Sequence, residues 1–435
     1  EPGCDKLSSV AVIGAGAAGL CAARHIQSRL NIFAPPVVFE LTENVGGTWC
    51  YDERVGMYDN GHPIHSSMYR NLRTNLPKEV MMFPDFPFES QLSSFLPHQE
   101  VQRYLERYCE SHNIRPHIRF NTVVETVKPV VVTMEDEETR TTRTTWEVTS
   151  SDSSGCQKTE TFDSVFVCSG HYSDPNVPDI PGIENFKGKV LHSHSYRYAE
   201  PFSGQSVVVL GAKASGLDIS IELAKVGAQV TLSHSRPPLT VPLLPGIRQS
   251  SPVVAVDKSG CIRFQDGSVS SADTLMFCTG YNFRYPFLDS AQLSLEIQDH
   301  VVSPLYRFLM PPAFPSLFFI GICKMIAPSP TSTIQFALAV LDGSVTLPPR
   351  VQMEEEVHRE QQEKIERGVE QRHLMLMEQE QWEYCHTLAG IAGFPPLPPT
   401  IRSLYEEVEP FRRRSLRTFC SLGQQQGAPL SPVRK

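Results

Sequence analysis

The sequence predicts an α/β fold with two nested dinucleotide-binding (Rossmann-like) domains, the second inserted into the first. A strand, a glycine-rich turn and a helix occur in order from residue 9, and the same design returns from residue 206. There is also an internal echo: residues 163–170 match residues 273–280 position for position, and each stretch reads as a strand that ends at a glycine. The two domains are therefore expected to be related in structure.

The echo also predicts the domain boundaries. Each of the two matching strands is the last strand of one mononucleotide-binding unit. The second unit lies in the sequence between the two halves of the first domain. The length of 435 residues is ample for this arrangement, at ~150 residues per domain. We expect a first domain in two parts, residues 1–172 and 281–349. The second domain is expected at residues 173–280, inserted between them, and a helical C-terminal region at residues 350–435.

Composition narrows the class of protein. The chain carries 39 Lys and Arg against 48 Asp and Glu, a formal net charge of −9, which argues against a dedicated nucleic-acid binder. Its longest uncharged stretches, residues 308–323 and 325–341, are broken by prolines and hydroxyl residues, so no transmembrane segment is expected. Eleven cysteines without a C-x-x-C pair, and the lack of an Asn-x-Ser/Thr site, predict a soluble, cytoplasmic protein.

The first glycine-rich turn follows the short apolar strand 9–13 and contains Gly14, Gly16 and Gly19 at G-x-G-x-x-G spacing. An Ala- and Leu-rich helix then runs to about residue 30. In this context the glycines let the backbone approach a pyrophosphate, and the free N–H groups and positive end of the helix stabilise its charge. The three glycines are therefore predicted to bind a dinucleotide.

Glu40 ends a second apolar strand, residues 37–39, and lies about 20 residues after Gly19. An acid at this distance accepts hydrogen bonds from a ribose diol and repels a 2′-phosphate, so the first site suits FAD or NAD and not NADP. A corner of small residues follows, which either passes close to a flavin or forms an ordinary loop with a core tryptophan. Its members are Gly46, Gly47, Thr48 and Trp49.

The second turn follows the strand 206–210 and carries a lysine in place of the middle glycine. Its predicted binding residues are Gly211, Lys213, Ser215 and Gly216. Lys213 either obstructs the close approach of a pyrophosphate or pairs with a phosphate, and the sequence leaves both readings open.

Ser235 and Arg236 follow the next strand, residues 229–233, where the first domain has its acid. Hydroxyls and a guanidinium suit a 2′-phosphate, so the second site is predicted to prefer NADPH. The alternative is a surface arginine that stands there by chance.

Three other regions carry no predicted chemistry. Residues 129–162 alternate apolar with Thr, Ser and Glu and read as a solvent-exposed β-meander. Residues 353–384 are rich in Glu with apolar residues at helical spacing, which predicts a solvated amphipathic helix. The last stretch, with arginines at 412–414, reads as a frayed basic tail whose three charges are too few for a lipid-binding cluster.

A specific signature lies between the two turns. Phe186, Gly188, His192 and Tyr196 match the F-x-G-x-x-x-H-x-x-x-Y signature of the flavin-containing monooxygenases at every fixed position. The chain resembles this family from about residue 10 to residue 349, and is most similar to its soluble, glucosinolate S-oxygenase-like branch. Because the related Baeyer–Villiger enzymes end the signature in Trp, Tyr196 indicates the branch that oxygenates heteroatoms.

The resemblance implies a monooxygenase that uses FAD, NADPH and O₂ and oxygenates a small-molecule sulfide or amine, with sulfur favoured by the branch. In that mechanism NADPH reduces the flavin, and a flavin hydroperoxide transfers its outer oxygen to the nucleophile. Asn75 matches the family asparagine that supports this intermediate, although by itself it reads as a turn residue, and Gln335 matches an FAD-site residue. His192 and Tyr196 are expected to fix the domain junction or line the nicotinamide path.

Two other functions stay open: an NADPH oxidase of the same architecture that releases hydrogen peroxide, and a non-catalytic nucleotide-binding relative, for which Lys213 is the best argument. His192 and His194 lack a third ligand at suitable spacing, so no metal site is expected. Cys168 and Cys278 lie in apolar strands and are expected to be structural. The number of subunits is left open, with a homodimer allowed.

Overall fold

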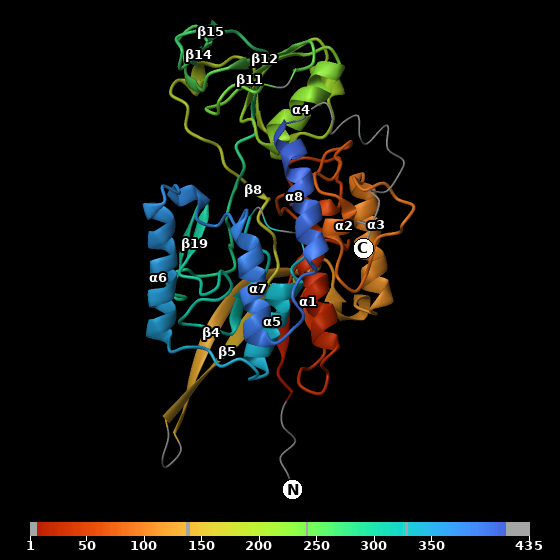
Figure 1. The fold of residues 1–435 in the computed structure, drawn as a ribbon, viewed down its shortest axis with the longest axis vertical. Helices are drawn as coiled ribbons and strands as arrows, with labels where there is room; N and C mark the ends of the chain where they lie inside the picture. The colour runs from red at the N-terminus through yellow and green to blue at the C-terminus, as the bar shows by residue number, and fades with distance from the viewer. Residues whose placement is uncertain (1–6, 136–139, 241, 325, 327–328, 415–435) are drawn as a thin grey trace.

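The computed structural model describes residues 7–135, 140–240, 242–324, 326 and 329–414 (Figure 1). Its two main sheets are both parallel, which confirms the predicted α/β class. All four residues of the central strand of the first sheet are buried, as expected of a parallel sheet covered on both faces. The order of the first sheet is β20 (Leu317–Phe319), β7 (Ser164–Val167), β1 (Val10–Ile13), β2 (Val37–Phe39) and β3 (Ile118–Arg119).

Helices cover one face of the first sheet and an antiparallel meander covers the other (Figure 1). The helical side is α1 (Ala17–Gln27), α3 (His98–Ser111) and α5 (Thr331–Leu341). The meander is β4 (Val123–Glu135), β5 (Arg140–Ser151) and β6 (Gln157–Phe162), which confirms the predicted strands but not their predicted exposure, because one face of the meander is buried against the first sheet. Trp146 of β5 is fully buried in the core between the meander and the first sheet, where its Nε1 donates to Ser316 Oγ at 2.9 Å.

The second sheet is built like the first. Its strand order is β12 (Ile247–Ser250), β11 (Gln229–Ser233), β10 (Ser206–Leu210), β16 (Thr274–Phe277) and β9 (Lys189–His192). Helix α4 (Ala214–Lys225) packs on one face of this sheet. A small antiparallel sheet packs on the other face and is made of β13 (Val253–Val256), β14 (Ile262–Phe264) and β15 (Val269–Ser270).

The chain leaves the first sheet after β7 and returns to it with β20, after the whole second sheet has been formed. The two crossings lie together: β8 (Asp174–Pro175) leads out, β17 (Tyr281–Asn282) leads back, and they pair antiparallel. They lie in the narrow waist between the upper and lower parts of the molecule (Figure 1).

The internal echo in the sequence has a structural counterpart. Asp163 Oδ2 accepts the Ser9 N–H at 2.9 Å just before β7, and Asp273 Oδ2 accepts the Ser206 N–H at 2.8 Å just before β16. Each aspartate therefore ties the start of its strand to the start of the neighbouring central strand. In both sheets an aspartate before one strand accepts a backbone N–H at the start of the central strand.

The C-terminal region corrects two sequence predictions. The Glu-rich stretch is not one helix, because α6 (Arg350–Glu366) ends just before Gly368, whose φ is +82°. The short helix η6 (Gln371–His373) and a turn follow, and Leu376 then forms an isolated β-bridge with Lys324. A second helix, α7 (Glu380–Ala392), then begins. The arginines at 412–414 belong to α8 (Pro399–Arg414), which is anchored earlier along its length by Tyr405 against Leu76 and Val80. The rest of the predicted basic tail lies outside the described residues.

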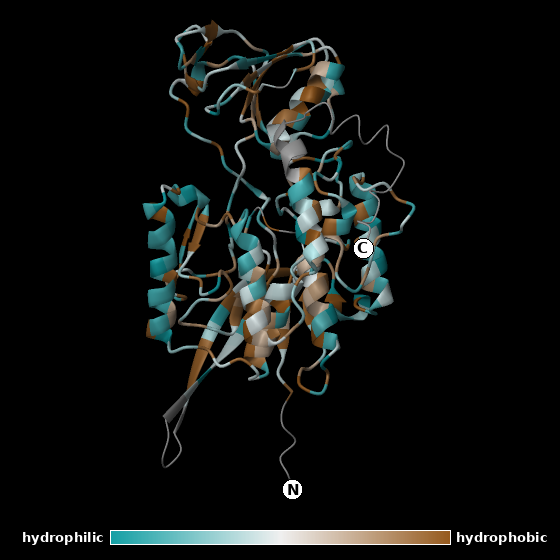
Figure 2. Ribbon diagram, in the orientation of Figure 1, coloured by the Kyte–Doolittle hydropathy of each residue, from teal (hydrophilic) through white to brown (hydrophobic). Residues whose placement is uncertain are grey.

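The outer face of α6 is solvated, as the sequence predicts (Figure 2). Its inner face buries Met353 and Val357 against the core of the first sheet. A short hairpin, β18 (Glu296–Gln298) and β19 (Val301–Ser303), completes the first domain. Across the described ranges, the helices are each too short or too polar to span a lipid bilayer.

Candidate dinucleotide sites and domain junction

The first glycine-rich turn connects β1 to α1 and is shaped by contacts that exclude side chains. Gly14 has a φ of +107°, and a Cβ there would lie 2.6 Å from the carbonyl oxygen of Cys168. A Cβ on Gly19 would lie 1.8 Å from the oxygen of Gly14, so this glycine lets the helix pack against the turn. The first N–H groups of α1 have no partner within the helix, which leaves a positive backbone end at the turn.

Glu40 braces this turn. Its carboxylate is 7% exposed, and Oε2 accepts the Ala15 N–H at 2.8 Å while Oε1 accepts the N–H of Thr42 at 2.9 Å. Because a carboxylate oxygen can accept more than one hydrogen bond, the group keeps capacity for the hydroxyls of a ribose. Glu40 therefore holds the loop and remains available to a ligand.

The corner that contains Gly47, Thr48 and Trp49 lies against the same turn. These residues form the short helix η1 (Gly47–Trp49), and the N–H of Gly46 donates to Ala15 O at 3.0 Å. A Cβ on Gly47 would lie 3.0 Å from the Cα of Gly16. The structure thus brings the predicted first-site residues of both segments together at the start of α1, in a backbone cradle that fits a pyrophosphate.

The second turn repeats this geometry. Gly211 has a φ of +104°, a Cβ there would lie 2.5 Å from the oxygen of Cys278, and a Cβ on Gly216 would lie 1.7 Å from the oxygen of Gly211. The Gly211 N–H donates to Ser233 O at 2.9 Å, just as Gly14 donates to Phe39 O at 2.8 Å. Residues 234–236 therefore stand at the second turn where Glu40 stands at the first.

The side chains after β11 match the sequence prediction in position. Ser235 and Arg236 are exposed, and Ser215 in the first turn of α4 is half-buried. Ser233 is buried and structural, because its Oγ donates to Ser251 O at 2.9 Å and accepts the Val253 N–H at 3.0 Å. Ser235 and Arg236, in contrast, make no hydrogen bonds of this kind within the described residues.

Lys213 occupies the N-cap position of α4 and faces other cations. Partial burial lowers its pKa, and the charges of Arg236 and Arg372 lower it further, whereas the carboxylates of Glu378 and Glu370 raise it. Burial lowers the pKa of Lys324 to about 8, with a contribution from the charge of Lys213. Because Arg372 is already paired with Glu370 at 2.7 Å, Lys213 and Arg236 are the cations of this group that an anion would meet.

The signature histidines hold backbone at the junction. His192 Nε2 lies 3.0 Å from Gly280 O, its Nδ1 accepts the His194 N–H at 3.0 Å, and His194 Nε2 lies 2.8 Å from Ile64 O. Burial lowers the pKa of His192 to about 4, so the ring is neutral at pH 7. Within the described residues no cluster of three or more His, Cys, Asp or Glu is arranged to hold a metal ion.

Arg197 follows the signature and was missed by sequence reasoning. Its guanidinium is 5% exposed and donates to five carbonyl oxygens, three of them in the first domain. Those three are Asp52 O at 2.6 Å, Arg54 O at 3.2 Å and Ser66 O at 3.2 Å, and the other two are His194 O at 2.7 Å and Tyr196 O at 3.0 Å. Nothing in the sequence distinguishes this buried arginine from a surface one.

Asn75 is exposed on a short segment between Thr74 and α2 (Lys78–Met81). The backbone around it is fixed, because the Thr74 N–H donates to Leu96 O at 2.8 Å and the Lys78 N–H donates to Ser94 O at 2.6 Å. Among the residues that the structure describes, the amide of Asn75 has no hydrogen-bond partner. It is available to a ligand in a way that a structural turn residue is not.

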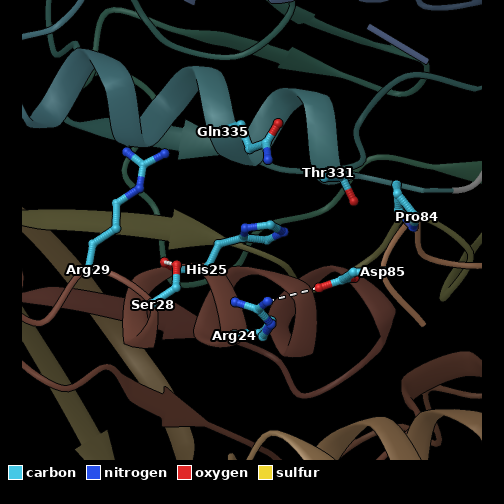
Figure 3. Close-up of a pocket in the computed structure, with 8 residues that line it drawn as sticks. All are labelled: Arg24, His25, Ser28, Arg29, Pro84, Asp85, Thr331 and Gln335. Atoms are coloured by element: carbon cyan, nitrogen blue, oxygen red, sulfur yellow. Dashed lines mark hydrogen bonds and ion pairs between the residues drawn. The ribbon is translucent and has the colours of Figure 1, made fainter. Parts of the chain in front are cut away.

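Gln335 lies apart from the glycine-rich turn. It lines a cleft of about 350 Å³ between α1 and α5, opposite His25 and Arg29 (Figure 3). The arginines of this cleft are already paired, Arg24 with Asp85 at 2.9 Å and Arg29 with Asp342 at 2.9 Å. A direct role of Gln335 toward FAD therefore stays a prediction.

The cysteines of the two echo strands are buried. Desolvation raises the pKa of the Cys278 thiol to about 12, and it raises that of Cys168 as well, so neither is a thiolate at neutral pH. No disulfide forms among the described cysteines. The carbonyls of these two residues, rather than their sulfurs, shape the glycine-rich turns.

Comparison with known proteins is consistent with this geometry. Residues 7–241 and 239–408 match a family model described as flavin-binding monooxygenase-like. The chain is 38% identical over 415 residues to the flavin-containing monooxygenase FMO GS-OX5 of Arabidopsis thaliana, which covers 89% of this chain and 85% of that protein.

Two solved structures are also similar. The S-allyl-L-cysteine S-oxygenase from Allium sativum superposes with a TM-score of 0.85 at 32% identity, over 97% of this chain and 98% of that one. Tmm from Pelagibacter sp. strain HTCC7211 superposes with a TM-score of 0.81 at 29% identity, over 95% of this chain and 92% of that one.

Proposed function

This chain belongs to the flavin-binding monooxygenase-like family, whose cofactors are FAD and NADPH, and from this premise we propose that it oxygenates a soft sulfur atom of a small molecule. One observation carries the use of two cofactors in this proposal: two glycine-rich turns of the same geometry stand beside opposite charges, Glu40 at the first and Arg236 at the second. An acid selects against a 2′-phosphate and an arginine selects for it. The pair therefore divides the two cofactors between the two sheets.

We assign FAD to the unit formed by residues 1–172 and 281–349, and NADPH to the inserted unit 173–280. The first turn and η1 hold the FAD pyrophosphate, with Glu40 on the ribose. Ser235 and Arg236 would hold the 2′-phosphate of NADPH, and Lys213 would offset the charge of its other phosphates. This choice for Lys213 follows from the nearby charge of Arg236, whose repulsion an anion would relieve.

A bound flavin would supply the oxygen-transfer chemistry, and the protein would supply its surroundings. Asn75 offers a neutral amide that donates and accepts hydrogen bonds without delivering a proton that would release peroxide. Neutral His192 and the carbonyl-bound Arg197 hold the junction without adding an acid near it. A sulfur substrate is favoured because similar proteins are named as S-oxygenases.

The test is to purify the protein, record its visible spectrum, and follow NADPH oxidation and peroxide release with and without a simple thioether. A yellow protein that converts the thioether to its sulfoxide with little peroxide supports the proposal. A yellow protein that releases one peroxide per NADPH, whatever thioether or amine is added, is an NADPH oxidase. A colourless, inert protein is a non-catalytic relative.

A further inference from the structure

Helix α4 carries two partly buried carboxylates that the proposed chemistry does not use. Asp218 and Glu222 are four residues apart and so lie on the same face of the helix. The Tyr69 hydroxyl donates to Asp218 Oδ2, and the Tyr196 hydroxyl donates to Glu222 Oε2 at 2.5 Å. We call these four residues the α4 clasp.

The clasp joins the two domains. Tyr69 comes from the first domain and Tyr196 from the signature after β9, yet both rings pack in the core of the second sheet, 5% and 1% exposed. Their ring centroids are 5.5 Å apart in an edge-to-face arrangement. Burial raises the pKa of both carboxyls, and hydrogen bonds offset the loss of water, from Tyr69 to Asp218 and from Tyr196 and Asn71 to Glu222.

The clasp fixes one end of the segment that bears Asn75. Directly after Tyr69, the Arg70 N–H donates to Arg197 O at 2.8 Å, and Leu72 packs against the core of the second sheet. The segment then passes to the first domain, where the Thr74 N–H donates to Leu96 O at 2.8 Å. Residues 69–74 therefore bridge the domains, and Asn75 follows at once.

The other end of α4 is the second glycine-rich turn. Asp218 and Glu222 lie ~6 Å and ~12 Å along the helix axis from its first residue, Ala214, at 1.5 Å per residue. A helix is stiff over this length, so a ligand that fixes the start of α4 also fixes the clasp. We propose that Asp218 and Glu222 are positioning residues that link NADP(H) binding at the start of α4 to the placement of Asn75, an inference that rests on the proposed function.

Hydrogen exchange tests this link without relying on turnover. The FAD-loaded protein is compared with and without NADP⁺, and exchange is followed in peptides that cover residues 69–76. In the unaltered protein NADP⁺ should slow exchange there. In Asp218→Asn and Glu222→Gln, NADP⁺ should still bind, by calorimetry, but exchange in these peptides should be about 5-fold or more faster than in the unaltered complex. Glu184→Gln, an exposed carboxylate of the same domain, is the matched control.

Turnover gives the second readout. The share of NADPH that ends as peroxide should rise in both clasp variants and stay unchanged in Glu184→Gln, whereas a merely structural loss would lower flavin content and melting temperature without changing this share. If a carboxylate variant does not fold, Tyr196→Phe, which removes one oxygen atom, takes its place.

The inference is overturned if clasp variants bind NADP⁺ and keep the exchange pattern and peroxide share of the unaltered protein. It is also overturned if NADP⁺ leaves residues 69–76 of the unaltered protein unaffected. Failure of the proposed function looks different: the unaltered protein then makes no sulfoxide, while the exchange result still decides whether α4 is linked to the Asn75 segment.

Discussion

Gly16 and Gly47 approach each other so closely that a Cβ built on Gly47 would lie 3.0 Å from the Cα of Gly16. The two glycines come from the turn before α1 and from η1, and they lie together at the candidate FAD site. A Cβ at position 47 would require the backbone at Gly16 to shift.

Gly16→Val should yield protein without FAD, because the γ carbons fill the space next to Gly47 that the pyrophosphate needs. The flavin absorbance per polypeptide after purification measures this. Gly390→Val is the matched control, since its Cβ meets nothing within 4 Å on the exposed side of α7. Normal flavin content in the Gly16 variant would place the pyrophosphate elsewhere.

Arg236→Ala should narrow the preference for NADPH over NADH by ~10–100-fold, the worth of a lost hydrogen bond to a charged group. The ratio of kcat/KM for the two nucleotides is the measurement. Arg263→Ala removes an exposed arginine from β14 in the same domain and should leave the ratio unchanged. An unaltered ratio in Arg236→Ala would mean that 2′-phosphate recognition lies on other residues.

Lys213→Ala distinguishes the two readings of the unusual residue in the second turn. If Lys213 pairs with a phosphate, the Kd for NADP⁺ should rise ~10-fold or more and FAD content should stay normal. Binding should also weaken with added salt less steeply than in the unaltered protein. Tighter binding in the variant would instead show that the lysine obstructs the pyrophosphate.

Asn75→Ala should raise the share of NADPH that is released as peroxide, because an amide that supports oxygen transfer is lost. The share is obtained from parallel assays of NADPH, peroxide and sulfoxide. Asn75→Asp keeps the size of the side chain but replaces the NH₂ donor, and it should show the same rise. If neither variant changes the share, Asn75 is only a turn residue before α2.

Stability should fall as the pH is lowered from 6.5 towards 4. Burial lowers the pKa of His25, His171 and His192 to about 4 from 6.5, so between these values the unfolded chain binds more protons than the folded one. Thermal unfolding across this range measures the slope. His192→Asn should make the slope shallower, whereas His358→Asn on the exposed face of α6 should not.

The sequence predicts both dinucleotide units because their signals are local. A strand, a turn and a helix occupy consecutive residues, and the contacts that require Gly19 and Gly216 lie within that short span, against Gly14 and Gly211. The C-terminal region is different, because its helices are set by distant partners. Tyr405 packs on Leu76 and Val80, and Leu376 forms a β-bridge with Lys324, contacts that no periodicity within residues 353–414 encodes.

The junction shows the same limit for the candidate site. His192 and Tyr196 are identifiable because they belong to a signature, but the acceptors of Arg197 are backbone carbonyls, which any residue type provides. Asp218 and Glu222 sit in a helix where acids usually face solvent. Only the tertiary arrangement shows that tyrosines more than 25 residues away cover them.

The position of β20 in the chain sets an order of assembly on the ribosome. The second unit is one continuous stretch, so β9 to β16 can fold as soon as that stretch has emerged. The first sheet cannot, because β7 leaves the ribosome with an unpaired edge that stays open until residues 317–319 arrive. During synthesis the second unit can be complete while the first sheet still lacks β20. Between the emergence of β7 and that of residues 317–319, the open edge of β7 can pair with another molecule.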